Sequence, residues 1–191
     1  MNERSWFSLE AFRMPEGFRG RSAFGVQLWW LCEALLFKTS PQFMYGFRVV
    51  LLRLFGARVG KRVVIRPNVT VTYPWKLIIE DDVWIGDNVT LYTLGEITIR
   101  SNTIVSQGSY ICAADHDYTK TNFPIRIRPI AIESGVWIGA RVFVCPGVNI
   151  CSGAVIGAGS VVTKSVLRAG VYAGNPCRFV KERTAAVADS D

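Results

Sequence analysis

Residues 138–143 read Ile-Gly-Ala-Arg-Val-Phe and residues 156–161 read Ile-Gly-Ala-Gly-Ser-Val, and this six-residue pattern decides the fold. On both sides of these hexads an aliphatic residue recurs at every sixth position within each group of three, and all fifteen of these anchors are Val, Ile or Leu: Val59, Ile65, Val71, Ile79, Ile85, Leu91, Ile99, Val105, Ile111, Ile132, Ile138, Val144, Ile150, Ile156 and Val162. A period of six fits neither a 3.6-residue helix nor plain strand alternation, yet the residues favour strands, and turn pairs such as Asp87-Asn88 interrupt them. The pattern predicts a short strand and a corner, repeated.

The anchors group into coils of three hexads. Successive groups start at residues 59, 79, 99, 132 and 150, so the steps are 20, 20, 33 and 18, and the third coil carries an insertion of about 15 residues (33 minus 18). Stacked coils place the anchors in three apolar columns inside a three-sided prism with parallel sheet on each face. We therefore predict an all-β solenoid of about five coils over residues 57–169, with a loop at 117–131. A right-handed solenoid with longer, less regular coils is the alternative that the period alone leaves open.

The net positive charge comes from one third of the chain. The 22 Lys and Arg against 15 Asp and Glu give a net charge of +7, and residues 1–66 alone hold 11 basic and 4 acidic residues. This distribution argues against a nucleic-acid-binding surface on the main body, whereas a local anionic partner such as a membrane surface remains open.

Cysteine and histidine usage narrows the compartment and the chemistry. The five cysteines form no C-x-x-C pair, and their odd number favours free thiols; together with the absence of a visible signal peptide this indicates a cytoplasmic protein. The apolar stretches 25–37 and 43–55 are shorter than the roughly 20 residues that a membrane span needs. His116 is the one histidine, so a zinc site of three histidines is excluded and we expect no metal.

The segments outside the prism are predicted to be an N-terminal arm with two helices and a short C-terminal unit. Within residues 1–56, we expect helices at 24–38 and 41–55. Their apolar faces are expected to cap the open end of the prism. This third of the chain is also expected to associate with the anionic inner face of the membrane, and the two roles are compatible. The basic side chains beside the apolar surface are Arg48, Arg53, Arg58, Lys61 and Arg62. Within residues 170–191, we expect a last strand, a turn at Asn175-Pro176, a short helix and a frayed tail.

His116 lies where the hexad rhythm breaks, at the start of the insertion. Functional residues concentrate where a loop departs from a rigid scaffold, and an imidazole can take a proton from a hydroxyl at neutral pH. Asp115 and Asp117 are the candidates to orient the ring, although both also suit a turn. Cys112 is a rival nucleophile for a covalent route, but nothing near it in sequence would lower its pKa.

These hexads resemble the repeats of the hexapeptide acyltransferases, whose fold is a left-handed parallel β-helix. The resemblance implies a sugar O-acetyltransferase in which His116 is the general base of direct acetyl transfer. It also implies that Asn88, eleven residues before Ile99, holds the acceptor.

Segments 136–140, 156–164 and 174–178 are similar to the acetyl-CoA groove of that family. By this resemblance Trp137 lines the thioester and pantetheine end, and backbone groups of Ala140 and Ala158 bond the pantetheine amides. The residues expected toward the nucleotide phosphates are Thr163, Lys164 and Arg178.

A narrower resemblance, to exopolysaccharide O-acetyltransferases of the colanic acid type, covers nearly the whole chain and includes Pro-Glu-Gly-Phe-Arg-Gly at 15–20 and Tyr-Pro-Trp-Lys-Leu at 73–77. It implies an exopolysaccharide sugar as acceptor, on a lipid carrier at the inner membrane face. The alternative is a small soluble acceptor, namely a free sugar, serine or an antibiotic. Because His116 and Trp137 end different faces of successive coils, we also expect a homotrimer in which neighbouring chains complete the site.

Overall fold

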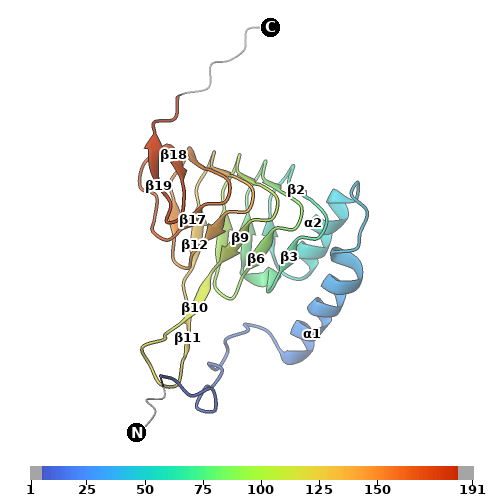
Figure 1. Ribbon diagram of the computed structural model, residues 1–191. Coiled ribbons are helices and arrows are strands. Elements are labelled where there is room, and N and C mark those ends of the chain that lie inside the picture. Colours follow the sequence, from blue (N-terminus) through green and yellow to red (C-terminus); the bar gives the residue numbers. More distant parts are fainter. Residues whose placement is uncertain (1–5, 185–191) are drawn as a thin grey trace.

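Short parallel strands stack into three sheets that form the sides of a prism in the computed structural model, which describes residues 6–184 (Figure 1). Sheet A contains β1 (Arg58–Val59), β4 (Leu77–Ile79), β7 (Ile97–Ile99), β12 (Ile130–Ile132) and β15 (Asn149–Ile150). Sheet B contains β2 (Val64–Ile65), β5 (Trp84–Ile85), β8 (Ile104–Val105), β13 (Trp137–Ile138), β16 (Ala154–Ile156) and β18 (Gly170–Ala173). Sheet C contains β3 (Thr70–Val71), β6 (Thr90–Tyr92), β9 (Tyr110–Cys112), β14 (Phe143–Val144) and β17 (Val161–Val162). The predicted solenoid is confirmed, with five full coils and a partial sixth made by β18.

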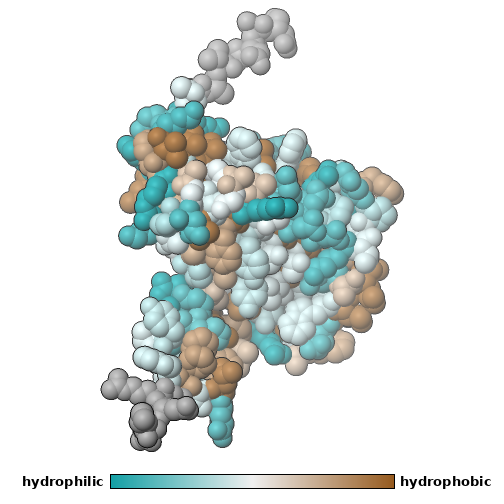
Figure 2. Space-filling model, in the orientation of Figure 1, coloured by the Kyte–Doolittle hydropathy of each residue, from teal (hydrophilic) through white to brown (hydrophobic). Residues whose placement is uncertain are grey.

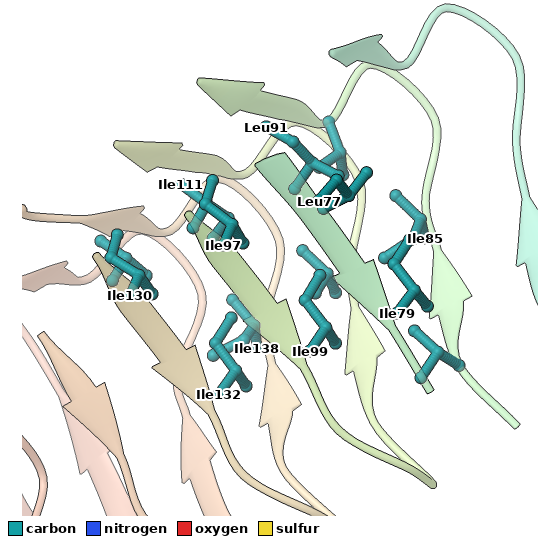
Figure 3. Close-up of a cluster of buried hydrophobic side chains, with 14 of the residues drawn as sticks. Leu77, Ile79, Ile85, Leu91, Ile97, Ile99, Ile111, Ile130, Ile132 and Ile138 are labelled. Carbon is teal, nitrogen blue, oxygen red and sulfur yellow. The ribbon is translucent and has the colours of Figure 1, made fainter. Parts of the chain in front are cut away.

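The strand register places the hexad anchors in the three predicted columns. Ile79 pairs with Val59 and Ile99, and Ile138 pairs with Val105 and Ile156. A further inward column, Leu77, Ile97 and Ile130, lies two residues before the first anchors, as strand alternation requires (Figure 3). Nearly all of these side chains are buried, so the prism interior is one continuous apolar core.

The corners explain why the repeat is six residues long. The third residue after an anchor has a left-handed backbone, with φ of 57° at Asn88, 56° at Arg141 and 70° at Gly159. This conformation suits Asn, Asp and Gly best, and it recurs at eleven corners: Arg62, Asn68, Asp82, Asn88, Asn102, Gly108, Gly135, Arg141, Gly147, Gly153 and Gly159.

The N-terminal helices close the first coil. They are α1 (Ala23–Cys32), the π-helical η1 (Glu33–Phe37) and α2 (Tyr45–Leu54), and a 3-10 turn, η2 (Pro74–Lys76), follows the first coil. The second helix begins at Tyr45 and not at Pro41 as predicted, because the carbonyls of Ser40 and Pro41 turn inward to accept hydrogen bonds from Arg48. Within residues 6–184, no helix is long and apolar enough to cross a membrane.

Side chains from these helices take the place of a missing coil at the open edge of each sheet. Arg53 donates to the Val59 carbonyl of β1 at 2.8 Å, and Arg48 donates to the Ile65 carbonyl of β2 at 2.9 Å. On β3, the Val71 N–H donates to the Glu33 carboxylate and the Val71 carbonyl accepts from the Trp29 indole, both at 2.7 Å. The cap prediction is thereby confirmed. Arg48 is fully buried, so its predicted place on a membrane face is wrong.

Two segments differ from their predicted form. The loop predicted at 117–131 is a protruding antiparallel hairpin of β10 (Ala114–His116) and β11 (Ile125–Ile127), and residues 130–131 already belong to β12 (Figure 1). The prediction of a short C-terminal helix is wrong, because residues 178–181 form the strand β19 (Arg178–Lys181), antiparallel to β18. The open edge of β18 offers a strand partner, and Phe179 packs edge-on against Tyr172 at 5.5 Å. Most of the predicted frayed tail, 185–191, lies outside the described residues.

Candidate active site

The hairpin holds His116 in one orientation. The His116 Nδ1 atom lies 2.8 Å from the carbonyl oxygen of Phe123, and the imidazole stacks on the Phe123 ring with centroids 4.4 Å apart and planes at 9°. A carbonyl only accepts, so Nδ1 carries the hydrogen. In the neutral ring Nε2 then presents its lone pair, which is the form that a general base needs.

The two flanking aspartates stabilise the hairpin. Asp115 forms a two-pronged ion pair with Arg126, at 2.7 and 2.9 Å, and Asp117 accepts from the Thr119 hydroxyl at 2.6 Å. The hydrogen bonds from Thr119 hold the pKa of Asp117 below its usual value. Within residues 6–184 the His116 ring bonds to a backbone carbonyl in place of either carboxylate. The sequence analysis did not predict a role for Arg126, because no sequence pattern marks it as the partner of Asp115.

Three predicted cofactor residues share one groove at the corner between sheets B and C. Trp137, Ala140 and Ala158 line a space of about 380 Å³, and the half-exposed Trp137 donates from its indole to Ser106 Oγ at 3.0 Å. The floor is backbone packed on backbone, since a Cβ on Gly139 would lie 2.7 Å from the Ala158 nitrogen. Small residues thus give a long ligand access to main-chain groups along the coil edge.

Asn88 lines a second space on the same corner, of about 690 Å³. Ser106 and Gln107 line both spaces, so the two adjoin. Gln107 was missed from the sequence, although it stands two residues after its anchor, at the corner position that Ala140 and Ala158 occupy in later coils. The hexad register could have found it.

The remaining predicted residues lie elsewhere. Thr163, Lys164 and Arg178 are exposed near the C-terminal end of the solenoid and do not line the groove of Trp137. Along the chain, His116 comes directly after a strand of sheet C, whereas the groove lies at the corner between sheets B and C. One chain therefore holds the base and the groove on different edges of the prism.

Cys112 is a poor nucleophile in this setting. Its thiol donates to the Ala114 carbonyl at 3.2 Å, and burial, followed by the charge of Asp115, raises its pKa. Because the thiolate is the reactive form, the raised pKa makes Cys112 less reactive as a nucleophile. All five cysteines are free thiols, as predicted.

A prism of hexads with a hairpin-borne histidine and a small-residue corner groove defines a hexapeptide-repeat transferase. Two family models match this chain: "Bacterial transferase hexapeptide (six repeats)" over residues 129–164 and "Hexapeptide repeat of succinyl-transferase" over residues 76–113.

Two similar proteins from Escherichia coli are both named as acetyltransferases. The chain is 51% identical over 175 residues to the Escherichia coli (strain K12) protein named "Putative colanic acid biosynthesis acetyltransferase WcaF", covering 92% of this chain and 96% of the relative. It is also 32% identical to the galactoside O-acetyltransferase of the same organism, over 71% and 68% of the two chains. This chain belongs to the hexapeptide-repeat acetyltransferases, in the group of the colanic acid type, and the resemblance seen in the sequence is confirmed.

Solved structures share the whole architecture. A galactoside acetyltransferase in complex with coenzyme A has a TM-score of 0.75 and 31% identity, covering 88% of this chain and 84% of that one. A maltose O-acetyltransferase from Clostridium difficile 630 has a TM-score of 0.75 and 28% identity, covering 86% and 90%.

Proposed function

We propose that this chain transfers an acetyl group from acetyl-CoA to a sugar hydroxyl in exopolysaccharide biosynthesis, with His116 as the general base. The observation that carries the proposal is the bond from His116 Nδ1 to the Phe123 carbonyl, which leaves Nε2 free to receive a proton. Nε2 takes the hydroxyl proton as the sugar oxygen attacks the thioester carbonyl. When the carbon–sulfur bond breaks, the imidazolium returns that proton to the departing thiolate.

The other predicted site residues take supporting roles in the proposal. The groove of Trp137, Ala140 and Ala158 receives the pantetheine arm, in keeping with the relative whose structure contains coenzyme A. Thr163, Lys164 and Arg178 face the nucleotide from the exposed C-terminal end. Asn88 holds the acceptor, and Asp115 and Asp117 shape the acceptor side through the hairpin. A homotrimer brings the hairpin of one chain to the groove of the next.

The His116→Ala variant tests the reaction. Loss of a general base lowers turnover by about 10²- to 10⁴-fold, while calorimetry should find acetyl-CoA binding nearly unchanged because the groove is separate. Turnover is measured as thiol release from acetyl-CoA with a methyl galactoside as acceptor. Cys112→Ala is the matched control and should retain wild-type turnover. Wild-type turnover in His116→Ala would end the proposal.

The acceptor is proposed to be a sugar of a growing exopolysaccharide on a lipid carrier, and the name of the 51% identical relative, a colanic acid biosynthesis acetyltransferase, supports the polysaccharide part of this proposal. The similarity to a galactoside O-acetyltransferase favours a free sugar as the second candidate. Transfer to free monosaccharides and to a polyprenyl-linked oligosaccharide separates the two. Equal efficiency on the free sugar would show that the lipid is not needed.

Membrane contact is proposed through the outer face of the cap helices. Phe24, Leu28, Leu31 and Leu35 are all exposed and are spaced to lie along one side of α1 and η1. Figure 2 shows hydrophobic surface along the outer edge of this helical region, beside neutral and hydrophilic surface. Arg48 and Arg53 serve the cap, so the attachment is mainly apolar, with exposed Arg21 adding attraction to anionic lipid.

Liposome flotation tests this contact. The wild-type chain should float with vesicles of phosphatidylcholine and phosphatidylglycerol, and Leu31→Glu with Leu35→Glu should abolish flotation, because each buries a charge in the interface. Leu167→Glu is the control, since Leu167 is even more exposed than Leu31 and Leu35 but lies at the far end of the solenoid. A wild-type chain that never floats would leave the helices as a cap alone.

A further inference from the structure

The residue that fixes His116 has an unusual backbone. Phe123 has a φ of +45°, and among residues 6–184 it is the one non-glycine with a left-handed conformation that is not at a solenoid corner. A bulky side chain avoids this region, and such residues persist only where their surroundings hold them. In this conformation the Phe123 carbonyl accepts from His116 Nδ1 while its ring stacks on the imidazole.

The surroundings that hold Phe123 come from the start of the chain. The Phe7 ring stacks on the Phe123 ring, with centroids 4.6 Å apart and planes at 25°. The Ser8 N–H donates to the Thr121 carbonyl at 2.7 Å, which ties the arm to the hairpin tip. Phe12 lies against His116 itself, with centroids 5.9 Å apart. Residues 7–12 therefore contact the hairpin at its strained residue, at its tip and at the imidazole.

We propose that the N-terminal arm, residues 7–12, is a positioning element for the catalytic base. The arm holds Phe123 in its left-handed conformation, the Phe123 carbonyl fixes the hydrogen on His116 Nδ1, and Nε2 is thereby kept as the proton acceptor. Phe7, Phe12 and Phe123 are positioning residues in this account, which rests on the proposed role of His116.

The bond to the Phe123 carbonyl determines the tautomer of the His116 imidazole. A free neutral imidazole exchanges between its two tautomers, and only the one with hydrogen on Nδ1 offers Nε2 as a base. When the arm no longer packs on Phe123, the carbonyl can turn away and the ring loses its bond. The fraction of His116 in the base-competent form then falls, whereas the residues that line the acetyl-CoA groove, none of which belongs to the arm or the hairpin, are unchanged.

The single histidine allows a direct measurement on the full-length protein. In a 15N spectrum at a pH where the imidazole is neutral, the ring nitrogens report on His116 alone. The wild type should show hydrogen on Nδ1. Phe7→Ala with Phe12→Ala, and separately Phe123→Val, whose β-branched side chain disfavours the left-handed region, should give a mixture of tautomers. The kcat for thiol release should fall about 10-fold, with the KM for acetyl-CoA within about twofold of wild type.

Control variants separate positioning from general damage. Leu9→Ala alters an exposed residue of the same arm and should leave both the tautomer and kcat unchanged. If the double alanine variant unfolds, Phe7→Leu with Phe12→Leu keeps apolar bulk without stacking and gives the same readouts. A spectrum and kcat identical to wild type in the folded arm variants would overturn the positioning role. The proposed function fails by a different result, wild-type turnover in His116→Ala.

Discussion

Asn88 occupies a corner whose left-handed backbone already favours asparagine, aspartate or glycine. Its φ of 57° is shared by Asn68 at the same corner of the preceding coil, where φ is 58°. A corner role therefore accounts for the residue type without any acceptor, and only the adjoining cavity separates the two positions. The side-chain amide and the backbone conformation have to be tested apart.

Glycine separates them, because it adopts the left-handed region freely. Asn88→Gly keeps the corner and removes the amide, so kcat/KM for a methyl galactoside should fall about 10-fold, as expected for one lost hydrogen bond to substrate. Asn68→Gly should have wild-type kinetics, and thermal unfolding of the two variants should match. Equal kinetics in both variants would make Asn88 a corner residue only.

At the scale of elements, the cap places a carboxylate where a strand would supply a carbonyl. Glu33 accepts from the Val71 N–H of β3, and burial raises its pKa, although the Val71 hydrogen bond and the charge of Lys38 oppose that rise. The folded protein therefore keeps a proton on Glu33 at pH values where the unfolded chain has released it. Stability from this site is fullest below the ordinary pKa and is lost as pH rises through the raised pKa.

Glutamine is the matched substitution, because it retains the acceptor oxygen and has no charge to desolvate. Urea unfolding should find Glu33→Gln more stable than wild type at pH 7, with the difference vanishing near the ordinary carboxyl pKa of about 4.3. Glu33→Ala should lose about 1–3 kcal/mol, because the Val71 N–H is left without an acceptor. A glutamine variant less stable than wild type across the whole range would show that the charge itself is needed.

Across the whole molecule, the local sequence pattern predicts the repeated strands and corners of the solenoid, but it does not predict structures that occur once in the chain. Each hexad states its own strand and corner, so the columns through Ile79 and Ile138 were readable from the sequence. The strand at 178–181 was not, because it depends on the open edge of β18 and not on its own pattern. The bond that orients His116 needs a strained carbonyl at Phe123 and an arm more than 100 residues away, which no local pattern encodes.

The separation of His116 from the groove also bears on how several copies of this chain would assemble. His116 lies beyond sheet C and Trp137 lies on sheet B of one prism, so under the proposed function a neighbouring chain would complete a site that uses both. Closed three-fold symmetry matches a three-sided prism and supplies three equal sites. Sedimentation should therefore find a trimer, and its sites should be shared between chains.

Mixed trimers test the sharing itself. His116→Ala and Trp137→Ala, each expected to have little activity alone, are co-expressed in equal amounts. If each site takes its hairpin from one chain and its groove from the next, one half times one half of the sites contain both wild-type parts, and roughly a quarter of wild-type activity returns. If each chain holds a whole site, no mixed trimer contains an intact one and activity stays at the level of the separate variants.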